Sequence, residues 1–260
     1  MNWPIYIDGV LIIIILATFT WLLSVFIKDV SIVDSAWSLM FLASAIYYYI
    51  INIELVNLKE NIFFILIVLW ALRLATHLTW RNWGEPEDRR YQDIRKKYSP
   101  KFELKSLFII FIFQAILAAI ISLPIVSVLG VRSGTTNLGI VEYAAVLIWL
   151  VGFIYESVAD WQLAKFKADK SNENKVMNAG LWRNSRHPNY FGEFLIWWGF
   201  YLYAMSTGPW WIVISPLLIS WLLLKFSGVV MLEETIVKRR PNYQEYIDKT
   251  NAFFPGKVKV

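Results

Sequence analysis

Cysteine is absent from this sequence of 260 residues, and histidine occurs only at His77 and His187. The first absence excludes disulfides, thiolate metal sites and cysteine nucleophiles. The scarcity of histidine excludes the histidine-rich iron sites of membrane desaturases and hydroxylases. We therefore expect no metal site, and any chemistry would depend on carboxylates, arginine, tyrosine, asparagine or a bound organic cofactor.

Charge is also scarce, since 17% of the residues are charged and 57% are hydrophobic. The mean hydropathy of +0.48 lies far from the balance of an average soluble domain. Uncharged runs cover residues 10–27, 35–53, 106–131 and 194–224. Each run is near or beyond the roughly 20 residues that cross a bilayer as a helix, and the runs are too many for one signal peptide. The sequence therefore predicts a multi-pass integral membrane protein.

The pattern predicts an all-α fold, a polytopic membrane bundle of about seven transmembrane helices in a single domain over residues 1–260. The expected helices are 5–27, 33–53, 61–82, 105–130, 137–165, 189–206 and 209–228. A Thr207-Gly208-Pro209 turn separates the last two. No internal repeat is visible, which disfavours an inverted-repeat transporter.

Lysine and arginine are concentrated in the loops after the first, third, fifth and seventh expected helices, whereas the opposite loops hold only Lys59 and Arg132. By the positive-inside rule, the N-terminus lies outside and the C-terminus is cytoplasmic. The polar segments 83–104, 166–188 and 229–260 then converge on the cytoplasmic side, where an anionic cytosolic ligand would bind. The absence of a targeting extension fits a bacterial inner membrane.

Ionisable side chains inside membrane spans are costly and usually face a cavity or a partner. Asp34, at the start of the second expected helix, is either a helix cap or a protonated acid that donates to a substrate carbonyl. Trp37, about one turn further on, would wall the same pocket. Arg73 and His77 share one face of the third helix, either in an ion pair with Asp34 or Glu156 or along a cavity. Asp34, Trp37, Arg73 and His77 are the candidate catalytic residues.

Glu156 and Asp160 stack on one face of the fifth expected helix, because they are four residues apart. Two carboxylates so close repel one another unless a cation, a hydroxyl-rich ligand or a proton lies between them. This arrangement favours a binding role. The alternative is a pair of ion-pair partners for Arg73 and the cytoplasmic lysines.

The densest polar motif covers residues 180–193, at the start of the sixth expected helix. Pro188 suits the first turn of a helix, whose free N–H groups bind anions. Nearby arginines match phosphates or a carboxylate, unless this basic flank serves topology alone. Together with polar groups of the other cytoplasmic segments, the motif supplies these candidate cofactor-binding residues: Arg81, Arg89, Arg90, Glu156, Asp160, Arg183, Arg186, His187, Asn189, Tyr190, Glu193, Glu233, Glu234 and Tyr243.

Three stretches together resemble the DUF1295 branch of the steroid 5-alpha-reductase family. They are Arg-His-Pro-Asn-Tyr-Phe-Gly-Glu at 186–193, the helix with Glu156 and Asp160, and the tail from Glu233-Glu234 to Pro255. The resemblance covers most of the chain and is strongest from about residue 140. It implies seven helices, NADPH bound in the cytoplasmic half of the bundle, and hydride transfer to an activated carbon–carbon double bond of a lipophilic enone.

Under this resemblance, Asn189 and Glu193 correspond to the polar pair of the family's cofactor motif. Asp160 resembles an aspartate that lies the same distance before that motif, and Asp34 resembles the carbonyl-binding acid, a glutamate in the steroid enzymes. Glu156 departs from the pattern because the steroid reductases carry an asparagine there.

A second departure is Glu233-Glu234, which replaces the His/Tyr pair expected after the last helix. This acidic pair suits the cationic sulfur of S-adenosylmethionine, and isoprenylcysteine carboxyl methyltransferases are similar in an Arg-His-Pro-x-Tyr-x-Gly stretch. The arginine clusters suit the phosphates of a nucleotide better. A non-enzymatic lipid-binding or scaffold protein would need no convergent polar groups. The sequence therefore favours an NADPH-dependent reductase of a lipophilic small molecule, with the lipid bilayer and no nucleic acid as partner.

Overall fold

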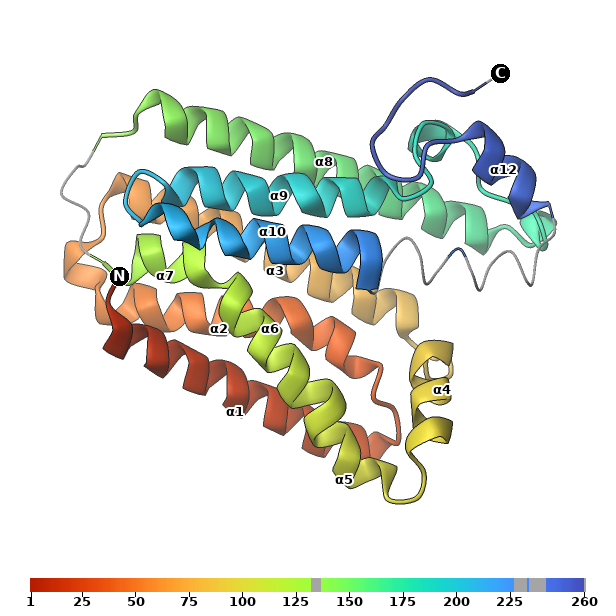
Figure 1. Cartoon of the computed structure of the whole chain (residues 1–260), viewed down its shortest axis with the longest axis horizontal. Helices are drawn as coiled ribbons and strands as arrows, with labels where there is room; N and C mark the ends of the chain where they lie inside the picture. The colour runs from red at the N-terminus through yellow and green to blue at the C-terminus, as the bar shows by residue number, and fades with distance from the viewer. Residues whose placement is uncertain (132–136, 227–232, 234–241, 260) are drawn as a thin grey trace. The chain divides into compact units, whose positions relative to one another are not determined.

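The computed structural model describes residues 1–131, 137–226, 233 and 242–259, and all regular structure in these ranges is helical (Figure 1). In the first half of the chain the elements are α1 (Trp3–Ile27), α2 (Ile32–Ile51), η1 (Ile53–Leu55), α3 (Leu58–Asn82), α4 (Arg89–Tyr98), α5 (Phe102–Ser106), the π-helix η2 (Leu107–Ile112), α6 (Phe113–Ile121) and α7 (Leu123–Leu129). In the second half they are α8 (Ile140–Ala168), η3 (Lys170–Asn172), η4 (Gly180–Arg183), α9 (Pro188–Ala204), η5 (Trp210–Val213), α10 (Ile214–Trp221), the π-helix η6 (Leu222–Phe226) and α12 (Tyr243–Lys249).

Among the described residues, four helical segments are long and apolar enough to cross a membrane: α1, α3, Phe102–Ile121 and α8. The chain is therefore an all-helical membrane protein with several candidate spans, as the sequence predicts. A shorter apolar helix in the described part of the chain covers Trp210–Lys225. Seven spans and the orientation of the termini stay predictions.

The observed helices follow the expected ones closely, and the differences have local causes. α3 begins at Leu58 instead of residue 61, because Asn57 caps it and Glu60 closes a capping box. The helix expected over 105–130 is divided at Ser122, two residues before Pro124. Proline lacks the N–H that would continue the helical ladder, so α6 ends there and α7 begins.

The described residues form two compact units. The first unit holds residues 1–138 and 207–212, and the second holds residues 139–206 and 213–260. The expectation of one domain over the whole chain stays a prediction.

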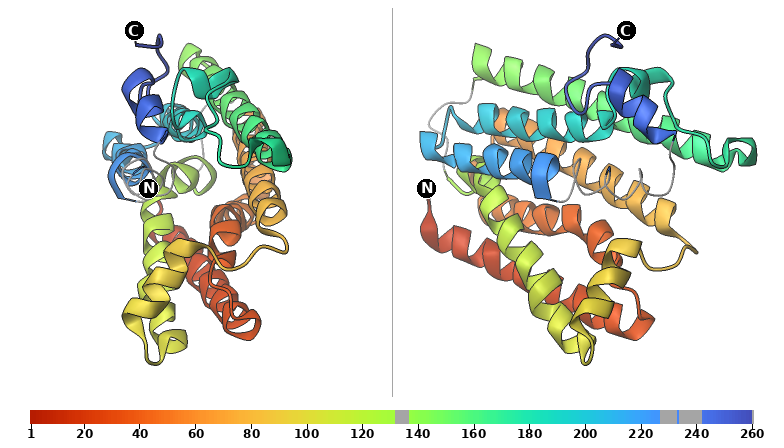
Figure 2. Two further views of the ribbon diagram at one scale, coloured as in Figure 1. Left: turned by 90° about the vertical axis from the view of Figure 1, so that its right-hand side faces the viewer. Right: turned by 45° about the vertical axis from the view of Figure 1, so that its right-hand side comes forward.

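In the first unit, α2 packs against both α1 and α3, and the three helices run side by side in Figures 1 and 2. The hydroxyl of Ser38 donates to the carbonyl of Ala71, 2.8 Å away, and so joins α2 to α3. The side chains of Phe41 and Trp70 meet edge to face between the same helices, and both are fully buried. Aromatic packing of this kind forms the core that holds the start of α2 in place.

In the second unit, α8 and α9 lie side by side along most of the length of α9 (Figure 1). Their backbones approach closely at two glycines. A Cβ added to Gly192 would lie 2.6 Å from the backbone nitrogen of Glu156, and one added to Gly152 would lie 2.7 Å from the carbonyl oxygen of Gly192. Because only glycine fits this crossing, the first turns of α9 are held against the part of α8 that carries Glu156 and Asp160.

Candidate functional site

The first unit contains a polar group that we call the α2–α4 cluster: Asp34, Asp88, Arg90, Tyr91 and Gln114. Asp34 lies in the first turn of α2, and its carboxylate accepts hydrogen bonds from Arg90 Nη2 at 2.8 Å and from the Tyr91 hydroxyl at 2.5 Å. Arg90 also donates to both oxygens of Asp88, at 3.0 and 3.1 Å. The two aspartates thus fix the guanidinium of Arg90 in one orientation.

The loop before α4 is tied to the chain just before α2, which explains how α4 reaches Asp34. The backbone N–H of Asp88 donates to Ser31 Oγ at 2.8 Å, and Asp88 then caps α4. The carboxylate of Glu87 accepts from the N–H of Val30 at 3.0 Å and forms an ion pair with Arg95 at 2.8 Å. α4 is therefore anchored by charge-assisted hydrogen bonds at its first turn and again at its middle.

Tyr91 is the buried centre of the α2–α4 cluster, with 6% of its surface exposed. Burial raises the pKa of its hydroxyl well above the usual range, and the nearby Asp34 carboxylate raises it further. The amide nitrogen of Gln114 donates to the same hydroxyl at 3.3 Å. The Tyr91 hydroxyl is thus a neutral donor held between one acceptor and one donor.

The candidate catalytic residues take different positions around this cluster. Asp34 pairs with Arg90 instead of Arg73, the partner considered from the sequence. Arg73 and His77 lie on one face of α3, as expected, and both side chains are half-buried. Trp37 points toward the core of the unit, where its ring meets the edge of another aromatic side chain on α2.

Two candidate cofactor residues of the first unit, Arg81 and Arg89, lie on its surface. Arg81 ends α3 and donates to the neighbouring Asn82 at 3.1 Å, whereas Arg89 begins α4. Arg90 is the member of this basic group that the fold directs inward. The fold therefore separates three arginines that the sequence grouped together.

The second unit contains what we call the α9-start cluster: Asp160, Arg186, His187, Asn189, Tyr190, Glu193 and Glu233. The amide of Asn189 donates to Asp160 Oδ1 at 3.1 Å, which joins α9 to α8. Glu193, one turn further along α9, accepts from the indole N–H of Trp197 at 2.9 Å. Both carboxylates are buried, with 6% of Asp160 and 7% of Glu193 exposed.

Arg186 connects the start of α9 to Glu233 and to the C-terminal segment. Its Nε and Nη2 donate to the two oxygens of Glu233 at 2.7 and 2.9 Å. Its Nη1 donates to the carbonyl of Ile247 at 2.9 Å and to the carbonyl of Thr250. Because carboxylate and backbone oxygens surround the guanidinium, the contacts of Arg186 within the described residues are structural: they connect the start of α9 to Glu233 and to the end of α12.

His187 shares the same carboxylate and caps the region where α9 begins. Its Nε2 lies 3.0 Å from Glu233 Oε1, and its ring stacks on Tyr190 with 5.5 Å between centroids. Burial raises the pKa of Glu233, but the hydrogen bonds of His187 and Arg186 outweigh burial and hold the pKa below its usual value. Glu233 is therefore the anionic centre of the cluster. Tyr243, at the start of α12, is buried and has its pKa raised by burial and by Glu233.

The segment after α12 is hydrogen-bonded along the stretch that leads into α9, in the part of Figure 2 where the C-terminus lies. Ser185 Oγ donates to the carbonyl of Phe253 at 2.7 Å. Asn184 and Gly256 exchange two hydrogen bonds of 3.0 Å each. We call this paired region the C-terminal clasp, and it holds Arg186 and His187 in position.

Some residues of the site are not among those that the sequence predicts, and some predicted ones lie elsewhere. Asp88, Tyr91 and Gln114 are the unpredicted members of the α2–α4 cluster; the signals were an aspartate and a tyrosine close to Arg90 in sequence and a lone amide inside a candidate span. Arg183 is exposed at the end of η4. Glu234 lies outside the described residues.

Fold and clusters together define a multi-pass helical membrane protein with buried polar groups at the first turns of α2 and α9. The chain matches the family described as "Protein of unknown function (DUF1295)" over residues 20–250. It belongs to this family, which is steroid 5-alpha-reductase-like, and the resemblance predicted from its motifs is confirmed.

The search of curated proteins gives a eukaryotic relative. The chain is 28% identical to an uncharacterised protein of the fission yeast Schizosaccharomyces pombe over 284 aligned residues, which cover 96% of this chain and 79% of the relative. No solved structure matches the chain. Because the relative comes from a fungus, the comparison does not support the expectation of a bacterial inner membrane.

Proposed function

We propose that this protein is an NADPH-dependent reductase that acts on an activated carbon–carbon double bond of a lipophilic, enone-type substrate. The observation that carries the proposal is the hydrogen bond between Asn189 and Asp160. These residues lie far apart in sequence, correspond to the cofactor motif of the steroid 5-alpha-reductases, and are brought together by the α8–α9 crossing. Family membership supports the same reaction class.

The residues around α9 suit the polar parts of NADPH. Asp160, Asn189 and Glu193 offer buried carboxylate and amide groups, which recognise ribose hydroxyls and a carboxamide by hydrogen bonding. Phosphates require cations, and the exposed guanidinium of Arg183 lies at the end of η4, a few residues before α9. Arg186 is the less suitable phosphate ligand, because Glu233 neutralises its charge. When bound, NADPH supplies the hydride for the reduction.

The α2–α4 cluster suits the second requirement of enone reduction, a donor to the substrate carbonyl. Negative charge develops on that oxygen when hydride adds to the double bond, and a fixed donor stabilises it. Tyr91 is a neutral, buried hydroxyl, and Asp34 with Arg90 fixes its direction. The donor in this proposal is Tyr91. Its single hydroxyl proton is hydrogen-bonded to the Asp34 carboxylate in this structure and would turn from Asp34 to the substrate oxygen when the substrate is bound. Hydride would add to the carbon β to the carbonyl, and a proton from water would add to the α carbon, which completes the saturated product.

The proposal includes seven membrane spans, an external N-terminus and a cytoplasmic C-terminus. Within the described residues, four candidate spans and the shorter apolar helix Trp210–Lys225 would supply five of the seven, and α2 and α9 would supply the other two. The basic loops between them support the orientation through the positive-inside rule. A lipophilic substrate would then enter from the bilayer.

The alternative of a methyltransferase is weaker once the contacts of Glu233 are known. Glu233 was the acid that suited a sulfonium ligand, and its carboxylate is paired with Arg186 and His187.

A thermal-shift titration of the detergent-purified protein with NADPH, NADH and S-adenosylmethionine tests the proposal, because a ligand that binds only the folded state raises its apparent stability. We expect stabilisation by NADPH, followed by NADPH consumption when enones are added. A shift with S-adenosylmethionine alone would replace the proposal with methyl transfer.

A further inference from the structure

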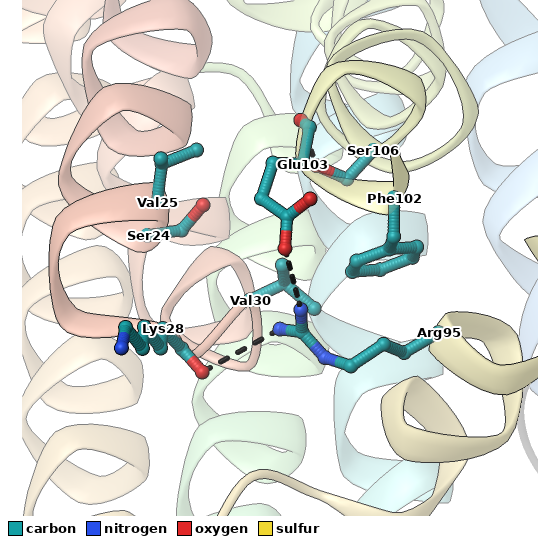
Figure 3. Close-up of a pocket in the computed structure, with 8 residues that line it drawn as sticks. All are labelled: Ser24, Val25, Lys28, Val30, Arg95, Phe102, Glu103 and Ser106. Carbon is teal, nitrogen blue, oxygen red and sulfur yellow. Dashed lines mark hydrogen bonds and ion pairs between the residues drawn. The ribbon is translucent and has the colours of Figure 1, made fainter. Parts of the chain in front are cut away.

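A cavity of about 140 Å³ lies in the first unit, where α1 ends and α5 begins (Figure 3). Its polar lining comes from three helices: Ser24 and Lys28 at the end of α1, Arg95 of α4, and Glu103 and Ser106 of α5. The ring of Phe102 and two valines complete the wall. The cavity has no part in the reaction proposed above.

The cavity lies at the ends of two candidate spans, because α1 ends there and the span Phe102–Ile121 begins there. In the proposed topology, these ends lie at the membrane surface. The indole N–H of Trp21 donates to the carbonyl of Glu103 at 2.8 Å and holds these two spans together. Large apolar side chains near the cavity are exposed, including Phe26 with 85% and Phe108 with 66% of their surface. Such exposed side chains in a membrane protein are suited to contact with acyl chains.

The charged groups of the cavity are of both signs. Arg95 is anchored by Glu87 through hydrogen bonds of 2.8 and 2.9 Å, and its guanidinium lies 4.4 Å above the ring of Phe102. Its other contacts are long, 3.6 Å to the carboxylate of Glu103 and 3.4 Å to the carbonyl of Lys28, as the dashed lines in Figure 3 show. A fixed cation and a loosely held, half-exposed carboxylate thus stand side by side.

We propose that this cavity binds the headgroup of a phospholipid that carries a primary amine, of the phosphatidylethanolamine type. The headgroup phosphate would pair with the guanidinium of Arg95, while its ammonium would donate to Glu103. Each charge of the headgroup then faces a side chain of opposite charge. The acyl chains follow the exposed apolar side chains of α1 and η2.

Charge selects this class over other phospholipids. An anionic headgroup without an amine would leave Glu103 facing negative charge. The trimethylammonium of phosphatidylcholine has no N–H, so it cannot hydrogen-bond to the carboxylate. Arg95 and Glu103 present one charge of each sign to the cavity, as does a zwitterionic headgroup.

Native mass spectrometry of the delipidated full chain tests the proposal, with titration of lipids that share the same acyl chains. The probes are phosphatidylethanolamine, its N-monomethyl and N,N-dimethyl derivatives, phosphatidylcholine and phosphatidylglycerol. We expect apparent affinity to fall as N–H groups are lost, about fivefold from phosphatidylethanolamine to phosphatidylcholine, which is the magnitude of a partly exposed ion pair. Equal binding of these two lipids, or tightest binding of phosphatidylglycerol, would overturn the proposal.

The matched variants are Glu103→Gln and, as a control, Glu85→Gln. Glu85 is an exposed carboxylate in the loop between α3 and α4, outside the cavity lining. Glu103→Gln should abolish the preference for the primary amine and Glu85→Gln should keep it. A preference that survives Glu103→Gln would also refute the assignment. The methylation series needs no variant, so the test stands even where a substitution impairs folding, and lipid binding is measured independently of any reductase activity.

Discussion

The Tyr91 hydroxyl lies 2.5 Å from Asp34 Oδ1 and donates a hydrogen bond to that carboxylate. The donor comes from a short polar helix between two candidate spans, and the acceptor comes from the first turn of α2. Arg90 binds the other oxygen of Asp34, so neighbouring residues of α4 clamp one carboxylate. In the proposed reaction, Tyr91 would replace Asp34 as the donor to the substrate carbonyl, and Asp34 would hold the hydroxyl until the substrate is bound.

Tyr91→Phe should therefore remove turnover while leaving the fold and NADPH binding intact. Loss of one fixed donor to a developing oxyanion costs about 10²-fold in kcat. Steady-state enone reduction and an NADPH thermal shift, measured on the same preparation, check the prediction. Tyr98→Phe is the control, since Tyr98 ends the same helix and is exposed. Full activity of Tyr91→Phe would exclude the hydroxyl from the reaction.

Asn189→Ala should weaken NADPH binding by about tenfold, because the substitution removes an amide and leaves Asp160 without that donor. The NADPH-induced thermal shift measures this change, and the melting temperature of the ligand-free protein reports on structural damage. A large fall in that ligand-free melting temperature, with an unchanged ligand shift, would mean that the pair is structural.

Arg186→Ala should destabilise the protein by about 3 kcal/mol, because it leaves Glu233 without its buried guanidinium partner. The C-terminal clasp also loses two hydrogen bonds from Nη1, so proteolysis after α12 should become faster. Arg183→Ala is the control, since this exposed arginine is three residues away and should change stability by less than about 0.5 kcal/mol. Equal melting temperatures for the two variants would contradict the role of Arg186.

The lowered pKa of Glu233 predicts how the stability of the protein depends on pH. Its pKa in the folded protein is held below the ordinary value of 4.5, so its contribution is present above that value and is lost as pH falls through the lower, folded pKa. The difference in melting temperature between the wild type and Glu233→Gln should therefore be constant near neutral pH and shrink below about pH 4.5. A difference that grows on acidification would show the opposite sign of the shift.

The orientation of the membrane spans can be tested directly because the chain has no cysteine. Glu173→Cys lies in an exposed position after α8, and Glu54→Cys lies in the exposed η1. In sealed cells, a membrane-impermeant thiol reagent should label Glu54→Cys and should label Glu173→Cys only after permeabilisation. The reverse pattern would invert the proposed topology.

The helices and their approximate ends were predictable from the sequence because their causes are local. Long uncharged runs require backbone hydrogen bonds within the segment, and caps such as Asn57 set the ends. The resemblance assigned Asn189 and Asp160 to one cofactor motif, but the hydrogen bond between them comes from the packing of α9 on α8. The division at Ser122 was the main departure, and its cause, Pro124, is also local.

Pairings between distant segments were decided only by tertiary structure. The sequence offers several acids for Arg90 and Arg186, and a side-chain pattern does not specify which one lies within 3 Å. Docking of α4 on α2 selected Asp34 for Arg90, and the C-terminal clasp selected Glu233 for Arg186. The sequence by itself thus determined the helical membrane architecture and the family, because these follow from composition and local motifs. The partner of each charge depended on packing over many residues, because a buried charge is stabilised only by the groups that the folded chain brings to it.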